Sequence, residues 1–507
     1  MFLVLLLASI TGGLLSLYVD FRAVSTVLYG EPGAAAVTAN FPAAITRDHP
    51  LNAHTLEAPS FGESSHTLKW LNEAVNASRA YMIEHFEEMR TMGKTCNVTS
   101  LREGVREDVI RLNEANDDDY LETISQLRHV ISLQINWNME THTEHAATDL
   151  YPLVNTRHGW SLTPGACAEQ DKKSDCFSHQ SNTTVITDEL VTEPWEPTFL
   201  HVIPNGTLHP WGFVKTEHVE FLPNSCMSPR VTHIHNYTIK SFAKEVFVIS
   251  SYWGGGFFHM SNDGLPRLVP YLPFLKANPA IKIHVLIYTR GKPYSGPAYI
   301  RYFKLLGLSP SRLVKGSVRA DIIYLPKGGN CYMIGEPNGQ MFSQVLRSSI
   351  RKLYPLDVAS PTKTLVLIQR TKSRQLVQHA DIKTMLEGVA KQSGLQFEVY
   401  SDDPMPNERD TWLMFYRAVM IVAPHGAGLS NMLLSRPGVY VVEVLCADDI
   451  NLCYSDLAFG QGNYYRGIGA TRGCERGMTV NVTQVIEAVQ AFLEQDAKIN
   501  SAQRLAS

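Results

Sequence analysis

The most regular hydrophobic pattern in the chain begins after Pro355 and continues to the C-terminal region. Short apolar runs predict buried strands at residues 363–369, 396–400, 419–423 and 439–445. Apolar positions at helical spacing predict helices at residues 382–392, 411–417, 429–434 and 483–493. Strands that alternate with helices form a parallel sheet, because right-handed crossovers return each strand in the same direction. We therefore expect an α/β, Rossmann-like domain over residues 356–507.

A second α/β layer is predicted upstream of this domain. Apolar runs at residues 245–250, 281–288 and 322–325 indicate strands, whereas residues 152–237 are rich in Pro, Thr and His and show no period. We assign residues 191–355 to an N-terminal Rossmann-like domain. Two such domains in tandem imply a cleft between them.

Helical spacing also appears nearer the N-terminus. Apolar positions at residues 68–89, 101–112 and 121–131 predict amphipathic helices that pack on the body of the protein. The segment before them, from about Ala23 to Ser65, mixes small and polar residues with prolines and shows no period, as a tether does. We assign residues 21–190 to a tether and a helical stem.

The first 20 residues are the strongest targeting signal. Residues 2–19 are almost wholly apolar and end at Asp20, which fits a cleaved signal peptide or an uncleaved signal-anchor. We expect the anchor, and hence a single-pass type II membrane protein with its body in the lumen of the endoplasmic reticulum or Golgi. Six Asn-x-Ser/Thr acceptors for glycosylation and eight cysteines without a CxxC pair agree with that location and favour disulfides over a metal site.

Composition narrows the class of partner. The chain has 507 residues, 44% hydrophobic and 19% charged, which is enough apolar material for two or three domain cores. A formal net charge of −4 without any Lys/Arg block gives no general attraction to nucleic acid. Nucleic-acid binding is therefore not expected.

A glycine corner after the strand at 419–423 is the first candidate site. Pro424 ends the strand, the residues from His425 to Gly428 form a turn, and a helix restarts at Leu429. Free N–H groups at a helix start suit phosphate, and open α/β sheets bind ligands at the carboxyl ends of their strands. The strand ends at Arg370 and Glu443 share this rim, so a diphosphate clamp and a ribose contact are predicted there. The alternative is an ordinary Gly-rich turn with a structural histidine.

The second candidate site follows a run of three glycines at residues 254–256. His259 and Asp263 lie four positions apart, on one face if the segment is helical, and could act as a base and its partner. The alternative is a buried structural hydrogen bond. Two acidic runs, at residues 117–119 and 402–403, are weaker candidates for a metal site, and a solvated charge run is favoured for the first.

The order of these motifs resembles glycosyltransferase family 61, which includes GlcNAc and xylose transferases. The resemblance covers roughly residues 244–493. It depends on the His-x-x-x-Asp segment at His259–Asp263, on a strand followed by Arg370, and on Pro-His-Gly-Ala-Gly-Leu-Ser-Asn at residues 424–431. A Val-Glu-Val tail at residues 442–444 also agrees.

The resemblance implies a GT-B fold, in which residues 356–507 bind the nucleotide sugar and residues 191–355 lie on the acceptor side. It also implies an inverting mechanism, UDP-GlcNAc or UDP-xylose as donor, a glycoprotein or glycan acceptor, and no metal or other cofactor. It makes Asp263 the catalytic base, or His259 with Asp263 orienting it. The donor-binding residues it implies are Arg370, His425, Gly426, Ala427, Gly428, Asn431 and Glu443.

Two other functions stay open. A luminal protein of the same fold could bind glycans or act as a scaffold without catalysis, and a metal-dependent GT-A transferase could use Asp402 and Asp403. An oxidoreductase, a serine hydrolase and a P-loop enzyme are disfavoured, because GxGxxG after a strand, GxSxG and the P-loop motif are missing from the sequence.

Overall fold

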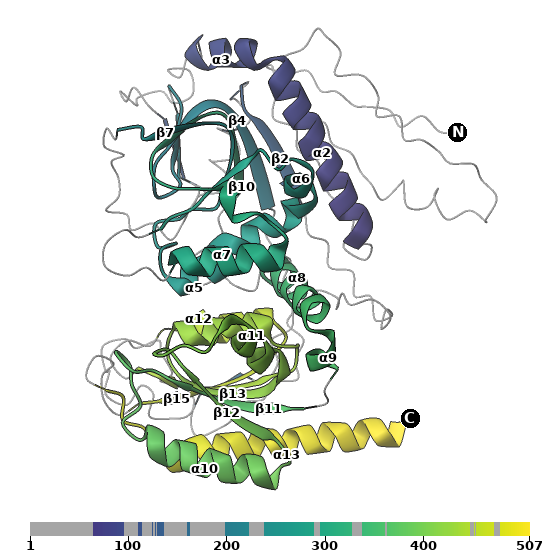
Figure 1. Ribbon diagram of the computed structural model, residues 1–507, viewed down its shortest axis with the longest axis vertical. Coiled ribbons are helices and arrows are strands. Elements are labelled where there is room, and N and C mark those ends of the chain that lie inside the picture. The colour runs from purple at the N-terminus through teal and green to yellow at the C-terminus, as the bar shows by residue number, and fades with distance from the viewer. Residues whose placement is uncertain are drawn as a thin grey trace, which may run out of the picture. The chain divides into compact units, whose positions relative to one another are not determined.

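The computed structural model forms two compact units (Figure 1). The first unit holds the described elements from Ser64 to Pro326 except one short strand, and the second holds that strand and the elements from Pro337 onward. The described residues are 64–95, 110–113, 124, 127, 129–135, 160–162, 198–217, 219–222, 238–287, 295–326, 337–359, 362–446, 451, 453–470 and 477–506.

The second unit is built on a parallel six-stranded sheet in the order β12-β11-β13-β14-β15-β3. The five strands after Pro355 therefore lie in the order 2-1-3-4-5, and the strand order reverses between β11 and β13. The sequence predicted four of these strands correctly and missed β15 and β3. The strands are β3 (Trp160–Leu162), β11 (Thr364–Gln369), β12 (Gln396–Ser401), β13 (Ala418–Pro424), β14 (Tyr440–Leu445) and β15 (Tyr464–Gly469).

Helices cover both faces of this sheet (Figure 1). In Figure 1, α10 and α13 lie on one face and α11 and α12 on the other. The helical elements of this unit are α8 (Pro337–Leu353), α9 (Pro355–Val358), α10 (His379–Gln392), α11 (Glu408–Arg417), the 3₁₀-helix η6 (Ala427–Leu434), α12 (Cys453–Gly460) and α13 (Val482–Ala506).

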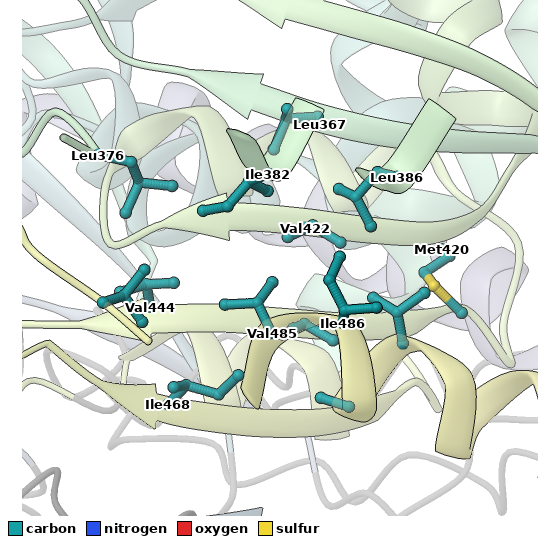
Figure 2. Packing of buried hydrophobic residues seen from close by; sticks show 14 of the residues in the cluster. Leu367, Leu376, Ile382, Leu386, Met420, Val422, Val444, Ile468, Val485 and Ile486 are labelled. Carbon is teal, nitrogen blue, oxygen red and sulfur yellow. The ribbon is translucent and has the colours of Figure 1, made fainter. Parts of the chain in front are cut away.

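The core of this unit explains why its strands read as continuous apolar runs. Alternate residues of each strand, such as Leu367 and Val422, pack against α10 and α13 through Leu386 and Val485 (Figure 2). The residues between them, such as Ile421, are equally buried on the opposite face. A parallel sheet covered on both sides needs apolar side chains in both directions.

The first unit contains a nine-stranded mixed sheet. Its path runs β1-β6-β5-β4-β10-β7-β8-β9, with β2 paired to β4. β10, β7, β8 and β9 are parallel, whereas β4 runs antiparallel to β10, β5 and β2. This unit is therefore α/β with an antiparallel extension rather than a purely parallel layer. The strands are β1 (Ile110–Asn113), β2 (Ile131–Ile135), β4 (Thr198–Leu208), β5 (Val214–Lys215), β6 (Val219–Leu222), β7 (Ser241–Val248), β8 (Lys282–His284), β9 (Leu313–Val314) and β10 (Val318–Pro326).

The prediction of a helical stem is confirmed only in part. The helices α2 (Ser64–Glu84) and α3 (Phe86–Thr95) confirm the first predicted helix, and α2 packs on the first unit (Figure 1). Arg79 of α2 binds Glu245 of β7 through two hydrogen bonds of 2.6 and 2.7 Å, and Tyr324 donates a third to the same carboxylate.

The prediction of helices at residues 101–112 and 121–131 is wrong where each range ends. Residues 110–113 and 131–135 are strands β1 and β2, which pair with the distant strands β6 and β4. Ile131 and Leu133 are buried in that pairing. Sheet pairing with segments far along the chain has overridden the local helical spacing, as tertiary context often does.

Residues 152–237 are also less irregular than their sequence indicates. They include the 11-residue strand β4, whose Pro204-Asn205-Gly206 stretch resembles a turn. Asn205 adopts a positive φ of 50°, yet the strand pairs with β10 on both sides of it.

Several expectations concern residues outside the described part of the chain. The apolar segment at residues 2–19, the tether and the acidic run at residues 117–119 lie there. Within the described ranges, no helix is both long and apolar enough to cross a bilayer. Cys446 and Cys453 are described and buried, and disulfide formation stays a prediction.

Candidate functional site

The predicted corner after β13 is a tight turn into η6. His425 continues the sheet, since its N–H donates to Val444 O at 2.8 Å. Gly426 then has φ 155° and ψ 169°, a conformation that essentially only glycine adopts. A Cβ on Gly426 would lie 1.6 Å from Nη1 of Arg370, so the turn also needs glycine for space. The backbone of Gly426 and the side chain of Arg370 are therefore packed directly together.

Arg370 follows β11 and lies over this turn. Its Nη1 donates to His425 O at 3.4 Å and its Nη2 donates to Ser373 Oγ at 3.1 Å. Burial lowers the pKa of Arg370, and the nearby Arg374 lowers it further, while Asp402 opposes the shift. A guanidinium has a pKa so high that it stays charged even so. The site thus holds a partly desolvated positive charge.

Asp402, at the end of β12, fixes the loop that carries Arg370. One carboxylate oxygen accepts from the N–H of Thr371 at 2.9 Å and from its hydroxyl at 2.8 Å, and the other lies 3.9 Å from Arg370 Nε. Lys372 makes an exposed ion pair with Asp403 at 2.9 Å. The ends of β11, β12 and β13 are therefore linked by side chains at one rim of the sheet.

His425 belongs to a buried hydrogen-bonded group. Its Nδ1 donates to Glu443 Oε1 at 2.6 Å, and Tyr465 donates to Glu443 Oε2 at 2.6 Å. Tyr454 packs edge-on against the imidazole at 5.1 Å between ring centres. Glu443 has no exposed surface, and burial together with this carboxylate raises the pKa of Tyr465 well above its usual value. Tyr465 is therefore neutral and donates its hydroxyl hydrogen to the Glu443 carboxylate.

These side chains surround the position where the order of the sheet reverses. Arg370 follows β11, and His425 follows β13, the two strands that are neighbours there. At such a point the crossover connections leave toward opposite faces of the sheet, which opens a crevice beyond the carboxyl ends of the strands. The N-terminal end of η6 adds backbone N–H groups at the same place. The arrangement suits an anionic ligand.

The second candidate pair lies in the first unit. Residues 257–277 form consecutive short helices: α5 (Phe257–His259), the π-helix η3 (Met260–Gly264), the 3₁₀-helix η4 (Leu265–Tyr271) and α6 (Leu272–Ala277). Single-turn π-helices are rare and often occur at functional sites. The wider turn carries Asp263, and His259 immediately precedes it.

The His259–Asp263 hydrogen bond is short, and the imidazole is more exposed than the carboxylate. Nδ1 of His259 lies 2.6 Å from Asp263 Oδ2, with the side chains 20% and 8% exposed, respectively. Burial raises the pKa of Asp263, while the hydrogen bond from His259 and the charge of Arg267 act in the opposite direction. With Nδ1 committed to the carboxylate, Nε2 of the more exposed imidazole is the nitrogen left to exchange a proton.

One comparison bears on the family of the segment that contains both candidate sites. Residues 257–442 match the family model described as Glycosyltransferase 61. We call this matched segment the glycosyltransferase 61 region. The match begins two residues before His259 and ends one residue before Glu443, so it includes both the His259–Asp263 pair and the glycine corner. The comparison with curated proteins gave no match.

The predicted donor residues, Glu443 just beyond the glycosyltransferase 61 region included, all lie around the rim of the second sheet. Gly428 packs closely on Ile368 of β11, and Asn431 is buried with its amide nitrogen donating to Gly428 O at 2.9 Å. Ala427 begins η6. Asn431, within η6, thus binds the backbone at Gly428, where the turn ends. His259 and Asp263 form their pair in the other unit, and their roles stay predictions.

Sequence reasoning missed Tyr465 and Tyr454, which contact Glu443 and His425. Tyr465 lies on β15, which was not predicted, and an isolated tyrosine carries no signal of its own. In the described ranges, no group of three or more His, Cys, Asp or Glu side chains has the arrangement of a metal site. Asp402 and Asp403, the residues considered for a metal, contact Thr371 and Lys372.

Proposed function

We propose that this protein is an inverting glycosyltransferase that moves a sugar, GlcNAc or xylose, from a UDP-sugar to a hydroxyl of a glycoprotein or glycan. The observation that carries the proposal is the contact between Arg370 and the Gly426 turn at the point where strand order reverses, within the glycosyltransferase 61 region. Such a rim binds phosphate groups in other open α/β sheets.

In the donor part of the proposal, Arg370 and the N–H groups at the start of η6 hold the diphosphate. The guanidinium is positioned by Ser373 and by the His425 carbonyl before any ligand arrives, so little ordering is needed on binding. A fixed positive charge in a partly buried site stabilises the charge that develops on the leaving diphosphate. No metal is required for that task, and metal independence is part of this proposal.

The geometry favours a changed role for Glu443. The sequence led us to expect that Glu443 holds the ribose or uridine. Both of its oxygens instead accept hydrogen bonds, from His425 and Tyr465, in a fully buried position. We propose that Glu443 orients His425 with Nε2 available to a donor oxygen, as a carboxylate partner orients histidine in many sites. His425 would then be the residue that touches the donor.

For the transfer step we propose that His259 is the base and Asp263 its orienting partner. Nε2 of His259 takes the proton from the acceptor hydroxyl as that oxygen bonds to the anomeric carbon of the sugar. The bond from this carbon to the diphosphate oxygen breaks at the same time, and its electron pair leaves with UDP. Attack from the side opposite the diphosphate inverts the anomeric centre. The ionised Asp263 stabilises the imidazolium that results.

The proposal extends to the arrangement of the two lobes and to the location of the protein in the cell. We propose the GT-B arrangement, in which one lobe binds the donor and the other the acceptor. We also propose that the protein resides in the endoplasmic reticulum or Golgi lumen and is attached to the membrane through residues 2–19. The apolar character of that segment and the glycosylation acceptors in the sequence support this location.

A donor screen tests the proposed activity. The purified protein is incubated with UDP-GlcNAc, UDP-xylose and other UDP-sugars, and released UDP is measured with and without EDTA. We expect release from at least one donor, unchanged by EDTA. Loss of release in EDTA would instead favour a metal-dependent transferase. UDP binding without release from any donor, with or without a glycan acceptor, would favour a silent glycan-binding protein.

A further inference from the structure

A row of aromatic side chains leads to the His259–Asp263 pair. Trp211 packs edge-on against Tyr252, and Tyr252 packs edge-on against Trp253, each at 4.7 Å between ring centres. The indole of Trp253 lies nearly parallel to the imidazole of His259, at 6.2 Å and 28°. Trp253, the last ring of the row, is thus a direct neighbour of His259, the proposed base.

The segment that carries Trp253 is held by backbone hydrogen bonds. Gly254 N–H donates to Ser251 O at 3.0 Å, and Gly256 N–H donates to Trp253 O at 2.9 Å. The hydroxyl of Tyr299 also donates to Gly254 O at 3.3 Å. The indole is therefore positioned by a folded turn and by the edge of Tyr252. A ligand that packs on this ring meets a surface that is already ordered.

Trp253 is 44% exposed, unlike most large aromatic side chains in the described part of the first unit. Several of those, such as Phe247 and Tyr271, are almost completely buried. Leaving much of an indole in water forfeits the stabilisation that burial gives, and exposed aromatic surface often marks an interaction site. The position of this ring beside His259 connects it to the chemistry of the pair.

Resting on the function proposed above, we propose that Trp253 is the platform for a pyranose ring of the acceptor. The face of an indole is electron-rich and attracts the C–H groups that line one face of a pyranose. The hydroxyls of a sugar stacked there project around the edge of its ring, and the imidazole of His259 lies 6.2 Å from the indole between ring centres. A serine or threonine of an unglycosylated peptide has no such flat apolar face. The acceptor class assigned by this geometry is therefore a glycan.

Binding of simple glycosides by the full-length protein tests this platform without requiring turnover. Methyl glycosides of glucose, galactose, mannose, xylose and GlcNAc are titrated, and saturation-transfer NMR reports which ring protons contact the protein. We expect at least one glycoside to bind through the C–H groups of one ring face. In Trp253→Ala its affinity should fall about tenfold, and Trp253→Phe should recover part of it.

Phe242→Ala is the matched control, because Phe242 is a 64% exposed aromatic residue on β7 of the same unit, away from the row. It should leave glycoside affinity unchanged. Equal glycoside affinity in wild type and Trp253→Ala, or no binding of any glycoside by the wild type, would overturn the platform. UDP binding and UDP release are measured on the same samples. Their failure would reject the proposed function, whereas their persistence with unchanged glycoside binding would reject only the platform.

Discussion

Replacing Gly426 by alanine is the most direct perturbation of the proposed donor site. The new Cβ would lie 1.6 Å from Nη1 and 2.7 Å from Cζ of Arg370. Nonbonded heavy atoms need about 3.5 Å, so the guanidinium must move by roughly 2 Å. Such a shift is large enough to break the bonds from Arg370 to the His425 carbonyl and to Ser373.

The size of the effect follows from what Arg370 contributes. A hydrogen bond to a charged group is worth about 1.5–3 kcal/mol, which corresponds to a loss of UDP affinity of roughly 10- to 150-fold. The backbone conformation at Gly426 adds a strain of about 1–3 kcal/mol that lowers the free energy of unfolding. Calorimetric titration with UDP at fixed ionic strength measures the first quantity, and denaturant unfolding measures the second.

Gly438→Ala separates the two contributions. Gly438 also has a positive φ, 86°, but a Cβ there meets no atom within 4 Å. This variant should lose stability and keep its UDP affinity. Arg370→Met should show the opposite pattern, and adding Gly426→Ala to it should cost no further affinity, because both changes remove one interaction. UDP affinity within twofold of wild type in Gly426→Ala would refute the donor site described here.

Three further changes have expected outcomes. Glu443→Gln places an amide donor against His425 or Tyr465, and should lower UDP affinity and cost about 1–3 kcal/mol of unfolding free energy, measured by calorimetry and urea denaturation. Arg79→Met leaves the buried Glu245 without its cation. It should cost about 2 kcal/mol in urea denaturation, less than a fully buried pair because Arg79 is 28% exposed, and Glu245→Gln in the same protein should restore part of that loss. Gly388 is an exposed position within α10 where an added Cβ would meet no atom within 4 Å. Gly388→Ala should therefore raise the free energy of unfolding by about 0.5–1 kcal/mol, because alanine favours the helix over glycine. A lower free energy of unfolding would contradict a helical, uncrowded Gly388.

The second sheet could be predicted because of how it is buried. Strands such as residues 418–424 are covered on both faces and give uninterrupted apolar runs, which the sequence displays directly. β15 carries Arg466, Gly467 and Gly469 within six residues, and these residue types do not form the apolar run that predicts a buried strand. β1 and β2 depend on partners far along the chain, and no local pattern reports such pairing.

Part of the candidate site could also be predicted from the sequence, and part could not. Arg370 and His425 could be placed together from the sequence, since the carboxyl ends of parallel strands meet at one edge, and they are in contact. The role of Glu443 could not be read correctly, because the second partner of its carboxylate, Tyr465, lies on a strand that the pattern did not reveal. The direction of a side chain at a strand end is set by such partners.

The central claim is that His259 and Asp263 carry out transfer in a protein that binds UDP-sugar elsewhere in its fold. The measurement that tests it most directly compares Asp263→Asn with wild type for two quantities on one sample, the rate of sugar transfer and the affinity for UDP. We expect transfer to be abolished in this variant while UDP affinity stays within a few-fold of wild type. Full transfer activity in Asp263→Asn would contradict it.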